Sequence, residues 1–548
     1  LMPLALAFSW RAVSRGKGYA LAALFLGATV CAHFLSGYLA LLALGVWVVV
    51  KPQQFLVRAG RAAIVGVGST LVAAWVLVPL FADSKYSART EFNTNTFWSD
   101  SYGGKKVMGW LFSGELFDHG RWPVLSVLVA IGALVCLWRR RDERARVILA
   151  FTAVGLLMFC GRGVLGPIVD HVLPGGKELL LHRFIIGVHF GGLVLAGIGA
   201  SFLAHTAFRE GRKRLPAVRP AVAIAVLLVL GLVVLTPAWR ERAHYNALDA
   251  QGIDAQRVAD ATDGRDFTSL ATQASAIGGG RIYAGAPAAT VQERIGQVPT
   301  YIYLLDDDVD AVGFGLRTLS LSSDVEVRFD DSNAAQFNLF NIRWLILPTN
   351  IRPAVPATRV RAQGRWQLWQ VPTTGYLQVV DTAPAIEADR TNIGQRTASF
   401  LGSPLPAQGL IPVIAFAGMS AAHPTDPTYA RFPTAAGAVT VQYDLPDDGA
   451  FGGEVKVERP SVVMLKATYD PRWHVKVDGK PAKTQMLAPS FVGVAVSAGK
   501  HRIEFTYVPY PYYWVLLTIG GLTLVGLALV PRALTRRRRQ KLQQSAAS

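Results

Sequence analysis

The segment 162–183, RGVLGPIVDHVLPGGKELLLHR, holds the densest group of ionisable side chains between two apolar runs. Arg183, with His182 beside it and Lys177 before the three leucines, could bind a phosphate group. A guanidinium suits that ligand because it donates forked, charge-assisted hydrogen bonds to phosphate oxygens. The alternative is that Arg183 only extends to ordinary lipid headgroups. We favour phosphate recognition, because Arg183 stands where an apolar run begins, at the depth of a lipid phosphate.

Three carboxylates could serve as a general base, which must lie within hydrogen-bond reach of the proton that it removes. They are Glu91 and Asp100 in the segment 82–121, and Asp170 in the segment 162–183. Both segments lie between apolar runs, on what we expect to be the same side of a membrane. Nothing in the sequence singles out one of the three, so the catalytic residue stays open.

His33 lies inside the long apolar stretch from Tyr19 to Val50. An ionisable group in such a stretch is a functional candidate by default, so His33 could contribute to substrate binding. The other interpretation is a neutral imidazole that bonds a backbone carbonyl where two short helices break. The sequence leaves both interpretations open.

A metal site is not expected. The acidic run at 306–310, DDDVD, has the oxygen ligands that calcium prefers. It lacks the glycine and the distant glutamate of a complete calcium loop, so we interpret it as an exposed acidic turn.

Composition and charge indicate a membrane protein. The chain has 548 residues, of which 51% are hydrophobic, and a net charge of +18. The excess basic residues lie in short segments beside apolar runs, so they indicate membrane topology, and we expect no nucleic-acid partner. The three cysteines, Cys31, Cys136 and Cys160, all lie within apolar runs, so no disulfide is expected in the hydrophilic part.

The last apolar run, 512–531, sets the orientation. Aromatic residues precede it and a basic tail, 532–548, follows it. Because positive flanks stay in the cytoplasm, we place this tail inside and the residues before the run outside. The sequence then predicts about eight spans with every basic loop on one side. The expected spans are two within 19–50, then 62–81, 122–138, 147–161, 184–206, 221–239 and 512–531.

The sequence therefore predicts a polytopic α-helical membrane protein with a large extracytoplasmic α+β region that ends in a β-sandwich module. We expect a helical membrane domain at 1–239, an extracytoplasmic α/β domain at 240–382, a linker-like segment at 383–435 and the sandwich at 436–511. Asp478-Gly479 should form a tight hairpin turn, and Gly499-Lys500 another. Trp473 should lie in the core of the module, beside the Asp478-Gly479 turn.

The segment 468–509 resembles the C-terminal module of YfhO-like bacterial membrane proteins. The matching residues are Tyr469, Pro471, Trp473, Asp478, Gly479, Gly499, His501 and Tyr507. Arg472 stands where this family usually has glycine. The stretch FNLFNIRWLILP, 337–348, looks like a strand of the same family, and the apolar pattern with HFLSG is similar to the GT-C glycosyltransferase superfamily.

This resemblance implies transfer of a sugar from a polyprenyl-phosphate carrier to a cell-envelope glycan or glycolipid, outside the inner membrane of a bacterium. The catalytic aspartate of such enzymes lies in an early external loop, which we do not find in this sequence. We therefore expect the chain to be a fragment of a longer protein. Members differ in their use of a divalent ion, so that cofactor stays open. The rival hypothesis is a non-catalytic protein that scaffolds, or assists the transport of, an envelope glycolipid.

Overall fold

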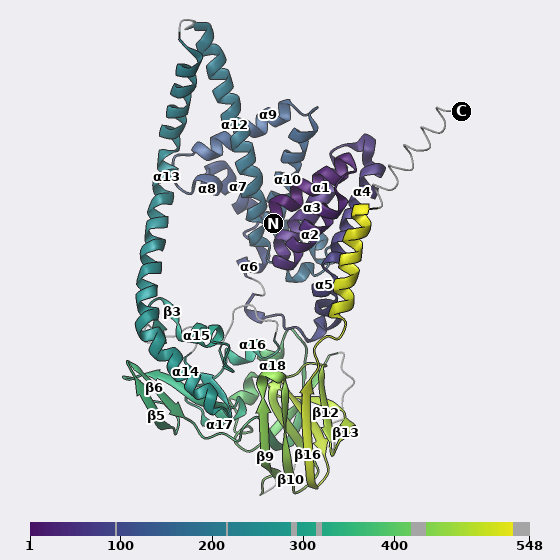
Figure 1. Cartoon of the computed structure of the whole chain (residues 1–548), viewed down its shortest axis with the longest axis vertical. Helices are drawn as coiled ribbons and strands as arrows, with labels where there is room; N and C mark the ends of the chain where they lie inside the picture. The colour runs from purple at the N-terminus through teal and green to yellow at the C-terminus, as the bar shows by residue number, and fades with distance from the viewer. Residues whose placement is uncertain (94–95, 215–217, 286–292, 314–319, 418–433, 530–548) are drawn as a thin grey trace, which may run out of the picture. The chain divides into compact units, whose positions relative to one another are not determined.

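The computed structural model describes residues 1–93, 96–214, 218–285, 293–313, 320–417 and 434–529. The chain forms two compact units (Figure 1). The helical unit comprises residues 1–81, 93–246 and 512–548, and the β-rich unit comprises 82–92 and 247–511. A helical N-terminal region and a β-rich C-terminal region are therefore both confirmed.

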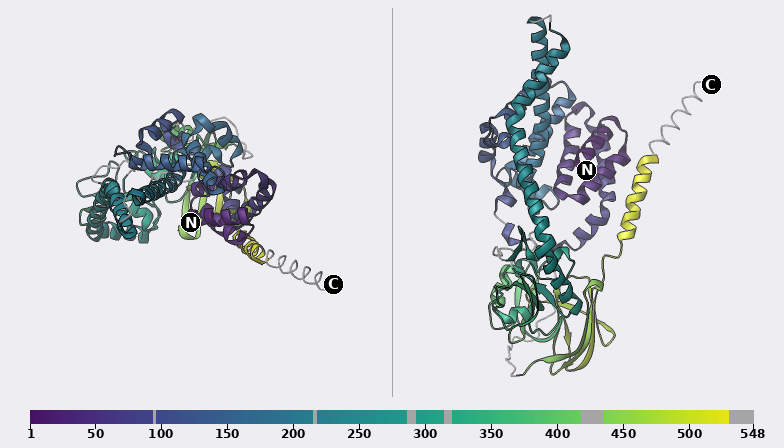
Figure 2. Two further views of the ribbon diagram at one scale, coloured as in Figure 1. Left: turned by 90° about the horizontal axis from the view of Figure 1, so that it is seen from above. Right: turned by 60° about the vertical axis from the view of Figure 1, so that its left-hand side comes forward.

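The first helices of the helical unit pack together as one bundle, in which α1 to α4 lie side by side (Figure 2). The apolar stretch 19–50 forms two helices separated at His33, whose backbone is extended, as the sequence predicts. The expected span at 62–81 differs. The helix that contains the start of this expected span begins at Phe55, before residue 62, and breaks at Ala73. The helices are α1 (Met2–Arg15), α2 (Tyr19–Ala32), α3 (Phe34–Val49), α4 (Phe55–Val72) and α5 (Ala74–Ala82).

The segment expected to be a loop at 162–183 contains a helix, α11, bent by 100° from the preceding α10. Gly161 connects the two with φ 86°, a left-handed conformation that glycine adopts without strain. Short helices also occupy the segment 82–121. The remaining helices of this region are α6 (Phe97–Asp100), α7 (Gly104–Ser113), α8 (Glu115–Asp118), α9 (Val124–Trp138), α10 (Glu143–Cys160), α11 (Arg162–Val172), α12 (Ile185–Arg214) and α13 (Pro220–Ala259).

The structure does not confirm eight spans. Among the described residues, three helices are long and apolar enough to cross a membrane: Pro52–Val72, Leu181–Arg214 and Pro220–Ile277. The bent pair α10 and α11 would make a fourth. Other expected spans form shorter apolar helices, such as α2 and the C-terminal helix Tyr513–Leu529. At about 1.5 Å per residue, a helix as short as α2 covers less than the roughly 30 Å of a bilayer core.

The β-rich unit begins with a small mixed sheet in the order β1-β4-β6-β5. Strand β1 (Arg281–Tyr283) runs parallel to β4 (Ile342–Pro348), and β6 (Trp366–Gln370) is antiparallel to both β4 and β5 (Thr358–Gln363). Helix α14 (Arg265–Ile277) packs against this sheet through Phe267, which contacts the ring of Trp366. Connecting elements are β2 (Arg294–Ile295), β3 (Val298–Pro299), α15 (Thr300–Asp306), α16 (Ser323–Glu326) and α17 (Ala334–Leu339).

The C-terminal strands form a five-stranded sheet, β13-β12-β16-β10-β9, and a closed five-stranded barrel, β11-β15-β14-β8-β7. One buried core joins them, with residues of both in a single cluster. The elements are β7 (Leu377–Ala388), α18 (Ile393–Leu401), β8 (Leu410–Phe416), β9 (Gly437–Leu445), β10 (Ala450–Val457), β11 (Ser461–Thr468), β12 (Trp473–Val477), β13 (Lys480–Ala482), β14 (Thr484–Leu487), β15 (Phe491–Val496) and β16 (Gly499–Tyr507).

This arrangement differs from the expected sandwich at 436–511. The segment 383–435, which we expected to be linker-like, carries the end of β7, helix α18 and β8. These strands close the barrel, because β7 pairs with β11 and β8 pairs with β14. Alanine and proline at the start of this segment made it resemble a linker, but the end of β7 pairs in parallel with β8, with Ala383 opposite Pro412 and Ile386 opposite Ile414.

The Asp478-Gly479 hairpin turn is confirmed. Both residues have positive φ, 50° and 76°, and the turn joins β12 to β13. Trp473 is buried in the core, as expected, but it begins β12 and so lies at the opposite end of that strand from the turn. Gly499-Lys500 does not close a hairpin, because β15 belongs to the barrel and β16 to the sheet.

Candidate functional site

The segment 162–183 folds around Arg162, which the sequence did not single out. The Arg162 Nε atom lies 3.1 Å from the Asp170 carboxylate, and its Nη1 lies 3.5 Å from that of Asp100. The same guanidinium donates hydrogen bonds to the backbone carbonyls of Ser99 and Gly176, at 2.6 and 2.7 Å. Arg162 thus connects the two loop segments and engages two of the three candidate bases.

Glu91, the third candidate, belongs to the β-rich unit, whereas Asp100 and Asp170 belong to the helical unit. Its carboxylate forms an ion pair with Arg328, and its backbone N–H donates to Asp324 Oδ2 at 2.9 Å. Each of the three candidate carboxylates is therefore already ion-paired with an arginine of its own unit.

His182 and Arg183 lie in a short 3-10 helix, Leu181–Phe184, that leads directly into α12. The His182 Nδ1 atom lies 2.5 Å from the carbonyl oxygen of Trp98, and its ring contacts the Trp98 ring edge-on at 4.9 Å. Arg183 is half-buried and forms no ion pair with a carboxylate of the described residues. Lys177 is exposed, in the 3-10 helix Gly176–Glu178. His182 is thus fixed by its contacts, whereas Arg183 keeps its charge without a carboxylate.

His33 has a local structural role. It caps the N-terminus of α3, where its Nδ1 accepts a hydrogen bond from the Ser36 backbone N–H at 3.2 Å. This differs from the expected bond to a backbone carbonyl, because an imidazole at the N-cap faces free N–H groups rather than free carbonyls. The exposed His33 ring needs no ligand to explain its place.

Basic side chains from several expected loops meet at one end of the helical unit. Arg58 Nη1 donates to Trp47 O near the end of α3, at 3.0 Å. Arg61 donates to Val13 O near the end of α1, at 3.1 Å, and Arg146 donates to Val50 O at 2.8 Å. Helix C-termini leave carbonyls unsatisfied and carry partial negative charge, so these arginines stabilise them.

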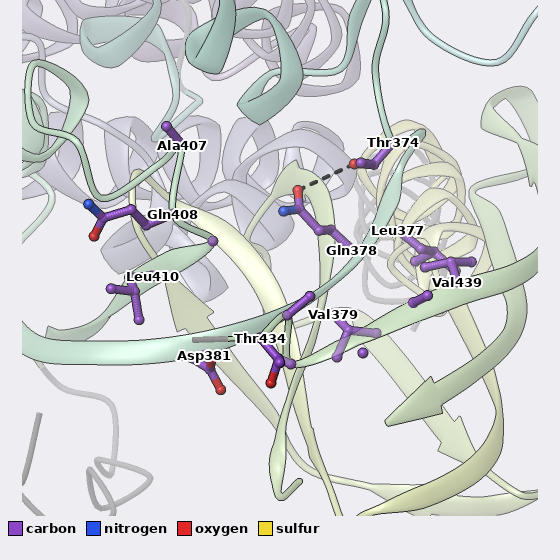
Figure 3. A pocket seen from close by; sticks show the side chains of 15 residues that line it. Thr374, Leu377, Gln378, Val379, Asp381, Ala407, Gln408, Leu410, Thr434 and Val439 are labelled. Carbon is purple, nitrogen blue, oxygen red and sulfur yellow. Dashed lines mark hydrogen bonds between the residues drawn. The ribbon is translucent and has the colours of Figure 1, made fainter. Parts of the chain in front are cut away.

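A groove of about 660 Å³ lies in the β-rich unit (Figure 3). Its polar side chains include Gln378, Asp381 and Gln408, from β7 and the turn before β8. Gln378 accepts a weak hydrogen bond from Thr374 at 3.4 Å, and Asp381 forms an ion pair with Arg459. The groove contains no aromatic side chain among its lining residues, so we assign no ligand to it.

A buried ionic cluster lies beside this groove. Lys466 is fully buried and donates to Asn338 O at 2.6 Å and to Thr374 Oγ1 at 2.8 Å, and burial lowers its pKa well below the usual value. Arg281 pairs with Asp310 at 3.0 Å. Burial raises the pKa of nearby Glu326 to about 7. Arg281 also donates to the Lys466 backbone carbonyl at 2.8 Å, so the cluster connects β1 to β11.

Among the described residues, no group of three or more histidine, cysteine, aspartate or glutamate side chains is arranged to hold a metal ion. The acidic run at 306–310 follows the end of α15, with Asp308 at a positive φ of 52°. The three cysteines are free thiols.

Residues 438–520 match the family described as bacterial membrane protein YfhO. This stretch contains the segment 468–509 but not the strand at 337–348, so the YfhO-like character is confirmed for the C-terminal module. No curated protein matches the chain.

Solved structures of the arabinofuranosyltransferase AftD from Mycobacteria are similar to this chain. One cryo-EM class of a point mutant is 13% identical with a TM-score of 0.39, and covers 92% of this chain but 48% of that protein. The structure without this mutation is 14% identical with a TM-score of 0.36, covering 90% and 45%. The chain thus spans about half the length of these proteins.

Proposed function

We propose that this chain is part of a membrane glycosyltransferase of the GT-C type. It would take a sugar from a polyprenyl-phosphate donor and transfer it to a cell-envelope glycan or glycolipid on the extracytoplasmic side. Two features support the class: the YfhO match and the combination of long apolar helices with a large hydrophilic unit. The proposal includes no resident metal. A divalent ion stays an option that chelation of active membranes would test.

Arg183 is the residue that we propose binds the phosphate of the donor. It is a half-buried cation without a carboxylate among the described residues, in the turn that leads into the 30-residue apolar helix α12. A half-buried cation at the end of an apolar helix is stabilised by an anionic partner, and a ligand can supply one. The N–H groups at the start of α12 add positive potential at the same place. A lipid phosphate fits this position by charge and by the forked geometry of the guanidinium.

Replacing Arg183 by alanine is expected to lower sugar transfer from a polyprenyl-phosphate donor by about 10- to 100-fold, since a charge-assisted hydrogen bond contributes roughly 1.5–3 kcal/mol. Arg183→Lys should recover only part of the activity, because the point charge remains while the planar fork is lost. The measurement is transfer of labelled sugar by membranes that contain equal amounts of each variant.

Arg141→Ala is the matched control, because Arg141 is an exposed arginine of the same unit. Full activity of Arg183→Ala would remove this residue from the site. Equal activity of Arg183→Lys and the unchanged protein would instead indicate an arginine that only reaches lipid headgroups.

A non-catalytic role is the second candidate. Asp100 and Asp170 are both held by Arg162, and Glu91 lies in the other unit, so none of the three is an unpaired base. A protein that only scaffolds or helps to move a glycolipid would bind polyprenyl phosphate through Arg183 without transferring sugar. Binding of polyprenyl phosphate in nanodiscs, without transfer by the same preparation, would favour this candidate.

We also propose the orientation in a bacterial inner membrane, with eight spans, residues 240–511 outside and the tail inside. Two sets of contacts support it. The basic segments expected inside meet through Arg58, Arg61 and Arg146. The segments expected outside meet through Arg162 and through His182 with Trp98.

A membrane-impermeant maleimide added from outside should label a cysteine placed at Ser332 and not one placed at Arg141, in a chain without its native cysteines. Ser332 is exposed in the β-rich unit, and Arg141 is exposed in the basic segment after α9. The reverse labelling pattern would invert the proposed orientation, and labelling of both positions in sealed cells would contradict it.

A further inference from the structure

A second cavity of the β-rich unit, of about 460 Å³, has a lining unlike that of the groove in Figure 3. Four aromatic rings and two carboxylates come together there from the segment after α5, from the turn between β11 and β12, and from the end of β16. They are Tyr86, Tyr469, Trp473, Tyr507, Asp83 and Asp470. Hundreds of positions separate Asp83 and Tyr86 from the other four residues, so only folding brings the two groups together.

The rings meet at angles, so they form several walls rather than one flat platform. Tyr86 and Tyr469 have ring centroids 5.8 Å apart at 47°, and Trp473 and Tyr507 have centroids 5.4 Å apart at 66°. Tyr469 and Trp473 are largely buried, while Tyr86 and Tyr507 are half-buried. Because Tyr86 also stacks on Phe416 at 5.8 Å, the exposed parts of Tyr86 and Tyr507 offer most of the apolar contact to a ligand.

The polar side chains that line the cavity are those of two aspartates, two serines and a threonine. Arg472 binds Asp83 Oδ2 through Nε at 2.9 Å and Nη2 at 2.6 Å, so the charge of Asp83 is compensated. Asp470 Oδ1 accepts a hydrogen bond from the Arg472 backbone N–H at 2.9 Å, which fixes the turn that carries it. Burial raises the pKa of Asp470 above the usual range. The hydroxyl groups of Ser87, Ser320 and Thr468 also line the cavity.

We propose that this cavity binds a neutral sugar unit of a glycan. A sugar ring presents C–H groups, which pack on aromatic walls, together with hydroxyl groups, which bond to carboxylates and to other hydroxyls. The volume falls within the roughly 300–1,000 Å³ of small-molecule sites. Asp470 disfavours an anionic ligand such as a uronic acid or a nucleotide, because like charges repel at short range.

This inference goes beyond the proposed function and does not rest on it. A scaffold or transport protein could hold a glycan here as well as a transferase could. The cavity lies in the β-rich unit and contains none of the residues proposed to bind the lipid phosphate. Binding is therefore measured without turnover, so that the two proposals can fail separately.

The test uses the whole chain in detergent on an array of immobilised bacterial oligosaccharides, both neutral and uronic-acid-containing. We expect binding to neutral glycans. The affinity for the tightest of them, measured in solution by tryptophan fluorescence, should fall by about tenfold or more in Asp470→Asn, which removes a charged acceptor while keeping the side chain's shape. Tyr86→Ala should weaken binding as well, through loss of an aromatic wall.

Tyr443→Ala is the matched control for Tyr86→Ala, since Tyr443 is an exposed tyrosine on β9 outside the cavity. Three outcomes would overturn the inference: no neutral glycan retained by the unchanged chain, a preference for uronic-acid glycans, or unchanged affinity in both cavity variants. Loss of binding in Asp470→Asn with Tyr443→Ala unaffected would support it, whatever the transfer assay shows.

Discussion

Replacing Trp473 by alanine should destabilise the β-rich unit by about 3–5 kcal/mol, the usual cost of removing a large aromatic side chain from a core. Trp473 is 9% exposed and belongs to the main buried cluster. Its ring contacts those of Phe451 and Tyr507 at 6.0 and 5.4 Å, and its Nε1–H donates to Thr468 O at 3.0 Å. The substitution therefore leaves a cavity and an unpaired carbonyl acceptor.

The whole chain is the right sample for this measurement. A fragment limited to 436–511 would lack β7 and β8, two of the five strands that close the barrel. The urea midpoint for loss of β structure should fall in Trp473→Ala, and hydrogen exchange should rise in β10, β12 and β16. Tyr443→Ala, on the exposed edge strand β9, should change neither quantity by much. An unchanged midpoint in Trp473→Ala would show that this core assignment is wrong.

Replacing Arg58 by methionine should destabilise the helical unit by about 3 kcal/mol, at the lower end of the cost of breaking a buried ion pair. Arg58 is 1% exposed and pairs with Glu143, which keeps some contact with solvent. It also donates to Trp47 O at 3.0 Å and to Gln54 Oε1 at 3.3 Å. Methionine fills much of the space of the arginine stem. The loss of stability therefore measures the polar contacts of Arg58 rather than its packing.

The readout for Arg58→Met is the midpoint of SDS-induced loss of helicity for the whole chain in detergent. Arg11→Met is the control, because Arg11 is an exposed arginine on α1 of the same bundle. We expect the double variant Arg58→Met with Glu143→Gln to regain part of the lost stability, since the Glu143 carboxylate, which keeps only Lys51 at 3.7 Å as a partner in the single variant, is then neutral. Equal midpoints for Arg58→Met and Arg11→Met would mean that the buried pair contributes nothing to the bundle.

Local patterns in the sequence predicted local structure well. The polar His33 within an apolar stretch longer than one span indicated a break, and the backbone is extended there. Asp478-Gly479 predicted a tight turn because both residues tolerate positive φ, and both have it. The Tyr-Pro-Trp pattern indicated the YfhO-like module, and a buried Trp473 followed from its place in an alternating strand. Each of these predictions depends on neighbours within a few residues.

Long-range pairing was decided only by the tertiary structure. The end of β7, from residue 383, was expected to be linker-like, because its proline and alanines are weak strand formers, yet it pairs with β8 within the closed barrel. Gly499 reads as a hairpin turn, but its flanking strands pair with different partners. Strand pairing depends on which surfaces meet, and a one-dimensional pattern does not encode that choice.

The contacts of the site residues likewise depend on which surfaces meet when the chain folds. The sequence determined that ionisable groups gather in 162–183 and that the chain is apolar enough for a membrane. It did not determine that Arg162 would bind Asp100 and Asp170 while Arg183 pairs with no carboxylate of the described residues, because an ion pair forms between side chains that folding brings within about 4 Å. Nor could it assemble Tyr86 with Trp473 into one cavity, since such contacts exist only after the two segments pack.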